Sequence, residues 1–171
     1  ATKLSQTLDL KVTVFDSEKA KQEGLEAFLA VGRGSAKEPK FIILNYTHPE
    51  AKFHLGLVGK GVTFDTGGLN VKTQGMVHMK SDMGGAATVL AATQLIAALR
   101  LPINLTTIVP AVENAIDKDA YLPSEVIQSH AGLSIEVIDT DAEGRLILAD
   151  GLSYLVKNYN PDQIIDFATL T

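Results

Sequence analysis

The chain has 171 residues, a length that predicts one domain, or one domain with a small part of another. Apolar residues make up 46% of the sequence and charged residues 20%, which excludes a disordered, collagen-like or low-complexity protein. The formal net charge is −5 and basic residues do not cluster, so we expect neither nucleic acid nor an anionic membrane surface as a partner. Because the chain has no cysteine, it cannot form disulfides or bind zinc through thiolates.

Two further features concern membranes and processing. The longest uncharged run, residues 84–99, is too short and too rich in alanine for a membrane span, so we expect no membrane crossing. The first residues lack an initiator methionine and the basic-then-apolar layout of a signal peptide. We therefore take the chain to be a processed or excised product.

Short apolar runs rich in β-branched and aromatic residues alternate with runs of helical periodicity. Strands are predicted at residues 11–15, 41–46, 53–58, 104–109, 134–138 and 163–167, and helices at 17–29, 85–99, 124–130 and 146–159. This alternation predicts an α/β fold, with a mixed, mostly parallel sheet flanked by helices on both faces in three layers. Ligand sites of such sheets gather at the carboxyl ends of the strands.

A glycine-rich segment, residues 58–72, leaves the end of a predicted strand and carries Lys60, Asp65 and Lys72. It does not fit a phosphate-binding P-loop, because His54 stands at the first glycine position and Gly61 follows the lysine. The dinucleotide-binding pattern also fails, because a phenylalanine replaces the third glycine. A glycine-rich turn with two solvated lysines remains an open alternative for this segment.

The entry to the alanine-rich helix holds Asp82 before two glycines. Taken alone, this aspartate is most simply interpreted as a helix cap. The glycines would let another group approach the backbone closely at the start of the helix.

The sharpest pattern, residues 139–145, directly follows a predicted strand and contains Asp139, Asp141, Glu143 and Arg145. In an extended segment these four side chains would project to the same side, where carboxylates repel one another unless a cation lies among them. A calcium loop of the EF-hand type is an alternative, but Asp150 stands where such a loop has a bidentate glutamate, and the preceding element is a strand.

Four acids therefore lie at strand ends or helix starts: Asp65, Asp82, Asp141 and Glu143. Their convergence would form one oxygen-rich site that suits two divalent ions about 3.5–4 Å apart, the arrangement used in metal-assisted hydrolysis. Lysines and an arginine at its rim would stabilise developing negative charge. The four histidines show no ligand spacing, and we expect them to be structural or exposed.

Four segments together closely resemble the leucyl (cytosol) aminopeptidase family. They are GKGVTFDTGGLNVK (59–72), MKSDMGGAA (79–87), TDAEGRLILAD (140–150) and ATLT (168–171). The resemblance implies a metallo-exopeptidase of the cytoplasm that hydrolyses the N-terminal bond of peptides with a water bridging two metals. It covers nearly the whole chain but only part of the family's length. Residues 1–171 are thus expected to be part of the catalytic domain, without the family's N-terminal domain and the C-terminal part of the catalytic domain.

The resemblance implies a role for each matching residue. The tighter metal would be bound by Lys60, Asp65, Asp82 and Glu143, and the exchangeable one by Asp65, Asp141 and Glu143. Manganese, zinc, magnesium and cobalt all suit such a site. A lysine binds a metal only when neutral, so the two dications must lower the pKa of Lys60 far below about 10.4.

Catalytic and substrate-binding roles are implied in the same way. Lys72 would polarise the scissile carbonyl, and Arg145 would hold a bicarbonate that serves as general base. Met79, Thr169 and Leu170 would contact the substrate. Asp139 departs from the family, which usually has asparagine there, and adds a negative charge beside the metals. Hexamers, usual in the family, would be expected of the full-length parent.

Two other functions stay open on the sequence alone. One is a metal-binding but catalytically silent fragment of such an enzyme. The other is a two-metal phosphoesterase, which the acids by themselves would permit.

Overall fold

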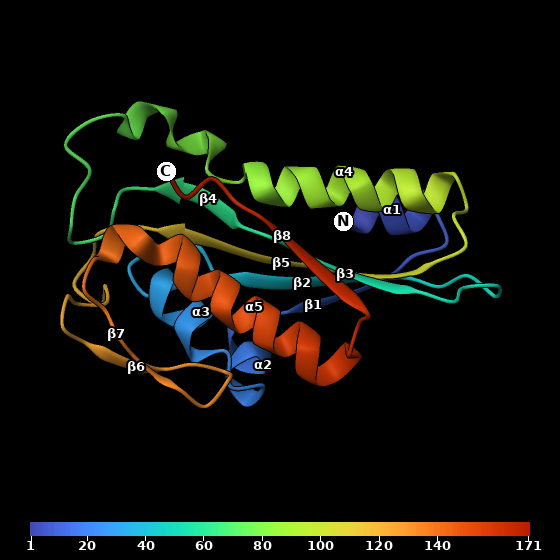
Figure 1. Ribbon diagram of the computed structural model, residues 1–171. Helices are drawn as coiled ribbons and strands as arrows, with labels where there is room; N and C mark the ends of the chain where they lie inside the picture. Colours follow the sequence, from blue (N-terminus) through green and yellow to red (C-terminus); the bar gives the residue numbers. More distant parts are fainter.

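The computed structural model describes residues 1–171 and has three layers (Figure 1). A six-stranded sheet lies between α4 and α1 on one face and α2, α3 and α5 on the other. The strands of the sheet are β1 (Lys11–Phe15), β2 (Lys40–Tyr46), β3 (His54–Gly59), β4 (Gly61–Asp65), β5 (Asn104–Asn114) and β8 (Gln163–Phe167). The helices are α1 (Thr2–Thr7), α2 (Ser17–Gln22), α3 (Glu26–Gly32), α4 (Gly84–Ala98) and α5 (Glu143–Tyr159), with 3-10 turns η1 (Met76–Ser81) and η2 (Thr140–Ala142).

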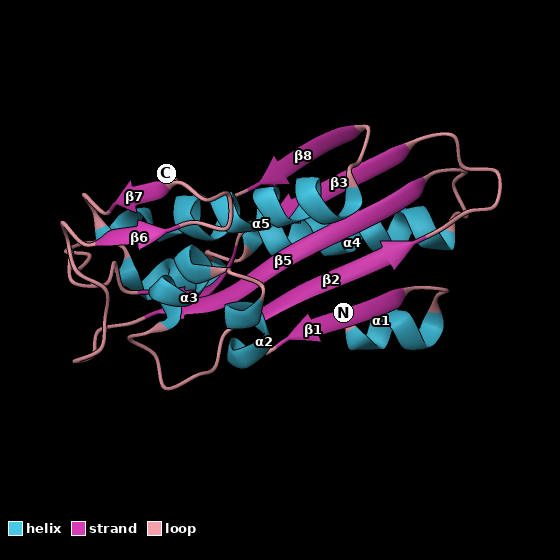
Figure 2. Cartoon of the chain, turned by 90° about the horizontal axis from the view of Figure 1, so that it is seen from below, coloured by secondary structure: helices cyan, strands magenta, loops and turns pink.

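The strand directions confirm a mixed, mostly parallel sheet. The order is β1-β2-β5-β3-β8, with β4 also paired to β5, and Figure 2 shows β8 at one edge and β1 at the other. Only β2 runs against its neighbours; β3, β4 and β8 are parallel to the strands that they pair with. The carboxyl ends of β3, β4, β5 and β8 therefore lie at the same end of the sheet.

The long strand β5 pairs with β3 along its first half and with β4 along its second. The β3 pairing ends at Val58 opposite Ile108, and the β4 pairing begins at Gly61 opposite Ala111. Lys60 lies in the break, where its backbone N–H donates to Phe167 O and its carbonyl accepts from Ala86 N, both at 2.9 Å. The break thus brings the Lys60 backbone against the end of β8 and the start of α4.

Alternating side chains of the central strands fill two separate cores. Ile43, Val58 and Ile108 belong to the core under α3 and α5. Their neighbours Leu44, Leu57 and Val109 belong to the core under α4. Since successive residues of a strand face opposite sides, this pattern explains why these strands are apolar on both faces, as buried parallel strands are.

The predicted helix at 17–29 is wrong as one element. The structure has two helices there, α2 and α3, because Gly24 adopts a φ of 76° between them. This left-handed conformation, which glycine adopts at no steric cost, interrupts the α-helical hydrogen bonds.

The predicted helix at 124–130 is also wrong. The segment contains strand β6 (Val126–Gln128), which pairs with β7 (Ser134–Glu136) in a separate two-stranded sheet. Strand β7 was therefore predicted correctly in type, but it does not join the main sheet.

Strand β4 lies within the glycine-rich segment and was not predicted from the sequence. No helix has the length and apolar character needed to cross a membrane.

Asp150 of α5 joins three parts of the fold and is fully buried. Its carboxylate accepts hydrogen bonds of 2.9 Å from the backbone N–H groups of Phe28, in the first turn of α3, and His130. Burial raises the pKa of Asp150, while these N–H donors oppose that rise. The side chain thus caps α3, whose own N-cap residue contributes no side-chain hydrogen bond.

We expect Asp150→Ala to lower the free energy of unfolding by about 2–3 kcal/mol, because it leaves buried N–H groups without an acceptor. Urea denaturation followed by circular dichroism measures the change. Asp166→Ala, at an exposed position on β8, is the control and should have little effect. Equal stability of the two variants would contradict the capping role.

Candidate metal centre

The five predicted metal ligands meet at the carboxyl end of the sheet. Lys60 lies in the break between β3 and β4, and Asp65 ends β4. Asp82 lies between η1 and α4. From the other face, η2 supplies Asp141 and the first turn of α5 supplies Glu143. Residues distant in sequence are thus brought together where α/β sheets place their ligands.

The inner part of the cluster is a buried lysine between two carboxylates. Lys60 Nζ lies 2.9 Å from Asp82 Oδ1 and 2.8 Å from Glu143 Oε1. All three side chains are at least 95% buried. Lys60 Nζ also donates a hydrogen bond of 3.1 Å to Thr169 O, and Thr169 Oγ1 donates one of 2.7 Å to Asp82 Oδ1.

The outer part repeats this arrangement nearer to solvent. Lys72 Nζ lies 2.9 Å from Asp65 Oδ2 and 2.6 Å from Asp141 Oδ1. Asp65, Asp141 and Glu143 each have a carboxylate oxygen within 4.8 Å of those of the other two. These three carboxylates therefore join the inner and outer parts.

The two lysines do not satisfy all carboxylate oxygens of the cluster, and divalent cations would. Oδ2 of Asp82 and Oε2 of Glu143 are buried and have no hydrogen-bond partner. Oε1 of Glu143 and Oδ1 of Asp141 lie within ion-pair distance of a lysine but lack the geometry of a hydrogen bond. Buried carboxylate oxygens without partners are costly, and oxygen atoms of this kind are the ligands that hard divalent cations prefer.

The electrostatics of the cluster lead to the same conclusion. Burial, together with the nearby Asp65 charge, raises the pKa of Glu143 to about 7 although Lys60 opposes the rise. Burial also raises the pKa of Asp141. For Lys60, burial lowers the pKa, but Glu143 and Asp82 outweigh it and the net shift is upward. Lys60 is therefore a charged ammonium among these carboxylates, and metal ligation would require dications to reverse this shift.

Gly144 is required for the path of the Lys60 side chain. A Cβ atom at this position would lie 2.7 Å from Lys60 Cε and 2.8 Å from Lys60 Cδ. Only glycine lets the lysine stem cross the first turn of α5 and reach Glu143. The glycine of the 140–150 segment thus has a steric role in the site.

The other predicted site residues surround the cluster. Thr169 touches Asp82, as described, and Met79 lies in η1, three residues before it. Leu170 packs beside Gly144. Arg145 is exposed, forms no ion pair, and lines a surface cavity of about 360 Å³ together with Asp139. The structure thus places all four near the carboxylates or on the adjoining surface.

Three interpretations from the sequence are wrong. Asp141 and Glu143 do not project from an extended segment, since they lie in η2 and in α5. Asp82 is not a helix cap, because α4 receives no side-chain cap and Asp82 faces Lys60. The EF-hand alternative fails because the Asp150 carboxylate binds backbone groups of α3 and of His130.

Sequence reasoning missed three buried residues that support the carboxylate cluster: Asn114, Tyr121 and Thr140. Asn114 Nδ2 donates to Asp65 Oδ1 at 2.8 Å, and the hydroxyl of Tyr121 donates to Thr140 O at 2.5 Å. Asn114 could have been found by the strand-end rule that singled out Asp65, but the predicted strand stopped at residue 109. No pattern in the sequence singles out Tyr121.

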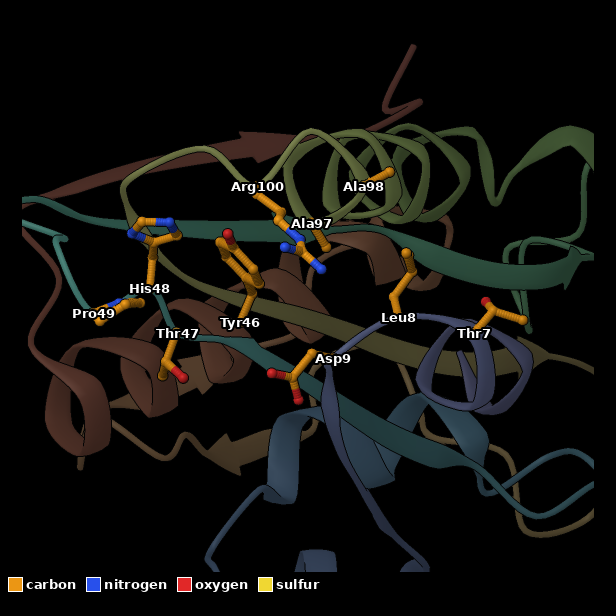
Figure 3. Close-up of a pocket in the computed structure, with 10 residues that line it drawn as sticks. All are labelled: Thr7, Leu8, Asp9, Tyr46, Thr47, His48, Pro49, Ala97, Ala98 and Arg100. Atoms are coloured by element: carbon orange, nitrogen blue, oxygen red, sulfur yellow. The ribbon is translucent and has the colours of Figure 1, made fainter.

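A cavity of about 530 Å³ lies elsewhere (Figure 3). It is bounded by the ends of β2 and α4 and by the α1–β1 junction, and its polar side chains include Asp9, His48 and Arg100. It contains none of the predicted site residues and lies at the opposite end of the sheet. We therefore assign the site from the carboxylate cluster and not from cavity size.

Comparison with known proteins places the chain in a family. Residues 1–171 match the model of the cytosol aminopeptidase family, catalytic domain. The chain belongs to this family. It is 53% identical over 167 residues to a probable cytosol aminopeptidase of Chlamydia caviae, and 52% identical over 163 residues to one of Chlorobaculum tepidum. These alignments cover 96% and 94% of this chain but 33% and 32% of the relatives.

Solved structures of family members have the same fold. The cytosol aminopeptidase of Coxiella burnetii superposes with a TM-score of 0.94 at 44% identity, covering 99% of this chain and 37% of that one. A leucine aminopeptidase of Caenorhabditis elegans gives 0.96 at 38% identity, with 99% and 35% covered. The α/β fold predicted from the alternation of strands and helices is thus confirmed, and the chain spans about a third of the length of the curated relatives that it matches.

The raised pKa of Glu143 predicts a pH dependence of stability in the metal-free protein. The folded state holds the Glu143 proton up to about pH 7, whereas the unfolded chain releases it near 4.5. The free energy of unfolding should therefore fall as the pH rises from about 4.5 to about 7. Glu143→Gln removes this contribution and should be more stable than the wild type at pH 8, by about 1–3 kcal/mol.

Urea denaturation between pH 4.5 and 8 in the presence of a chelator measures this effect. Glu136→Gln, at an exposed position, is the matched control and should follow the wild-type profile. Parallel profiles of wild type and Glu143→Gln would show that Glu143 is not the titrating group.

Proposed function

We propose that residues 1–171 are part of the catalytic domain of a metal-dependent aminopeptidase, which removes N-terminal residues from peptides. The observation that carries the proposal is the close approach of Asp65, Asp141 and Glu143, within 4.8 Å, between two lysines. Membership of the cytosol aminopeptidase family supports the same activity. The names of the relatives support a cytoplasmic location, and hexamers are proposed for the whole protein by the family resemblance alone.

We assign the metal ligands to two ions. Lys60, Asp65, Asp82 and Glu143 would hold one, and Asp65, Asp141 and Glu143 the other. Asp65 and Glu143 are then shared, which agrees with their positions between the two lysine groups. The oxygen-rich ligand set with one amine suits manganese, zinc, magnesium or cobalt.

When bound, two divalent ions supply Lewis acidity toward a peptide carbonyl and lower the pKa of an attacking water. The chain's own cations act beside them. Lys72 is the more exposed of the two lysines, and Asp141 and Asp65 keep it protonated by raising its pKa against the effect of burial. Its ammonium can stabilise negative charge on the carbonyl oxygen. Arg145, exposed and without an ion pair, is free to hold a bicarbonate as general base.

The substrate side of the site would be formed by Met79, Thr169 and Leu170. Thr169 is fixed by its hydrogen bond to Asp82 and by the hydrogen bond from Lys60 to its carbonyl. A substrate contact at Thr169 would therefore be coupled to the position of two metal ligands. Leu170 is 44% exposed, so it can still contact the first side chain of a peptide.

Titration with Mn²⁺ in a calorimeter tests the metal site. We expect the chain to bind about two equivalents and Asp141→Ala to lose one, because this aspartate serves only one of the two ions. His78→Ala, at an exposed position of η1, is the control and should bind two. Absence of binding, or full binding by Asp141→Ala, would contradict the ligand assignment.

Hydrolysis of leucinamide by the Mn²⁺-loaded chain tests the activity separately. We expect turnover that Asp141→Ala and Glu143→Ala abolish and His78→Ala retains. Binding of two metals without any turnover would favour the catalytically silent fragment. Cleavage of a phosphate ester instead of the amide would favour the phosphoesterase.

A further inference from the structure

Asn114 connects the two loops that carry the metal-site carboxylates. It ends β5, is fully buried, and lies opposite Asp65 in the β4–β5 pairing. Its Nδ2 donates 2.8 Å to Asp65 Oδ1 and 3.1 Å to Thr140 O. No other side chain forms hydrogen bonds to both Asp65 and Thr140. One amide group therefore joins the end of β4 to η2.

The orientation of this amide is determined by its neighbours. A carboxylate oxygen and a backbone carbonyl can only accept hydrogen bonds, so the group between them must be the NH₂ end of Asn114. Both N–H bonds are then used, one for each loop. The Oδ1 atom of Asn114 is buried without a hydrogen-bond partner. An unsatisfied buried acceptor of this kind lowers the stability of the folded protein.

The hydrogen bond from Asn114 determines which oxygen of Asp65 is left to face the cluster. Oδ1 accepts from Gly67 N at 2.8 Å as well as from Asn114, while Oδ2 faces Lys72 at 2.9 Å. Two donors on one oxygen fix the plane of the carboxylate and direct the other oxygen toward the centre of the cluster. Without Asn114, only the Gly67 N–H would hold Oδ1.

The contact with Thr140 fixes the second loop. Thr140 O accepts from Tyr121 OH as well as from Asn114. Thr140 N donates 2.9 Å to Asn70 Oδ1, and Asn70 N donates 2.8 Å to Thr140 Oγ1. Asp141 follows directly in the chain, so its position depends on how Thr140 is held against the loop that follows β4.

We propose that Asn114 is a positioning residue that sets the orientation of Asp65 and its distance from Asp141, and thereby the affinity of the site for divalent cations. The proposal rests on the metal site proposed above. Residues that hydrogen-bond to metal ligands change metal affinity by about 10–100-fold when they are lost.

The test measures Mn²⁺ affinity by calorimetry and stability by urea denaturation. Asn114→Leu is nearly isosteric and removes both donors. Thr107→Val is the matched control: Thr107 is fully buried on the same strand, and its Oγ1 lies 2.6 Å from Thr93 Oγ1. We expect Asn114→Leu to bind Mn²⁺ about 10–100-fold more weakly. Thr107→Val should lose stability and keep its affinity.

A second variant separates the two contacts. Tyr121→Phe removes the other donor to Thr140 O and leaves Asp65 untouched, so it should weaken Mn²⁺ binding less than Asn114→Leu. If Asn114→Leu does not fold, Asn114→Ala replaces it. Wild-type affinity in a folded Asn114 variant, or an equal loss of affinity in Thr107→Val, would overturn the proposal.

Amide hydrogen exchange in the metal-free protein tests the positioning role of Asn114 independently of metal binding. Gly67 N and Thr140 N are hydrogen-bonded within the joined loops, so both should exchange faster in the Asn114 variant than in Thr107→Val. If the wild type binds no Mn²⁺, the proposed metal site fails, and the exchange result alone decides whether Asn114 joins the loops. Unchanged exchange would then overturn its positioning role.

Discussion

Four carboxylates packed at the carboxyl end of the sheet must be balanced by positive charge, and most features of the site follow from this constraint. Asp82 and Glu143 share Lys60, while Asp65 and Asp141 share Lys72. Four acids therefore face two ammonium groups, and several of their buried oxygens have no hydrogen-bond partner. Burial, together with the charge of Asp65, raises the pKa of Glu143, and the remaining negative charge of the cluster favours the binding of divalent cations.

The backbone is arranged to make this concentration of charge tolerable. The break between β3 and β4 directs Lys60 into the cluster, and Gly144 lets its stem pass α5. Asp82 lies two residues before the first residue of α4, and Glu143 is the first residue of α5. The positive end of a helix dipole stabilises a carboxylate there. The same helices bury the two faces of the sheet, so site and core are stabilised together.

The sequence predicted which acids come together better than it predicted the segments that hold them. Asp65 and Glu143 were identified because acids at strand ends and helix starts converge in α/β folds. The extended path assumed for residues 139–145 was wrong, because the side chain of Asp139 accepts from Asp141 N and closes a turn. Such a local choice between strand and turn depends on a single hydrogen bond, which periodicity cannot reveal.

Tertiary contacts explain the remaining differences. The short strand β4 (GVTFD) was not predicted because glycines surround it, and pairing with β5 stabilises it. Strand β6 forms because β7 lies beside it, against a helical periodicity over the same residues. Asn114 was missed since its role exists only where β4, β5 and η2 meet.

We propose that this cluster of carboxylates and lysines is a two-metal site. Anomalous diffraction from crystals of the chain grown with Mn²⁺ tests it most directly. We expect two anomalous peaks among the carboxylates, one beside Asp82 and Glu143 and one beside Asp65 and Asp141. Peaks only at surface carboxylates, or a cluster in which Lys60 and Lys72 keep all of their present ion pairs without any bound metal, would contradict it.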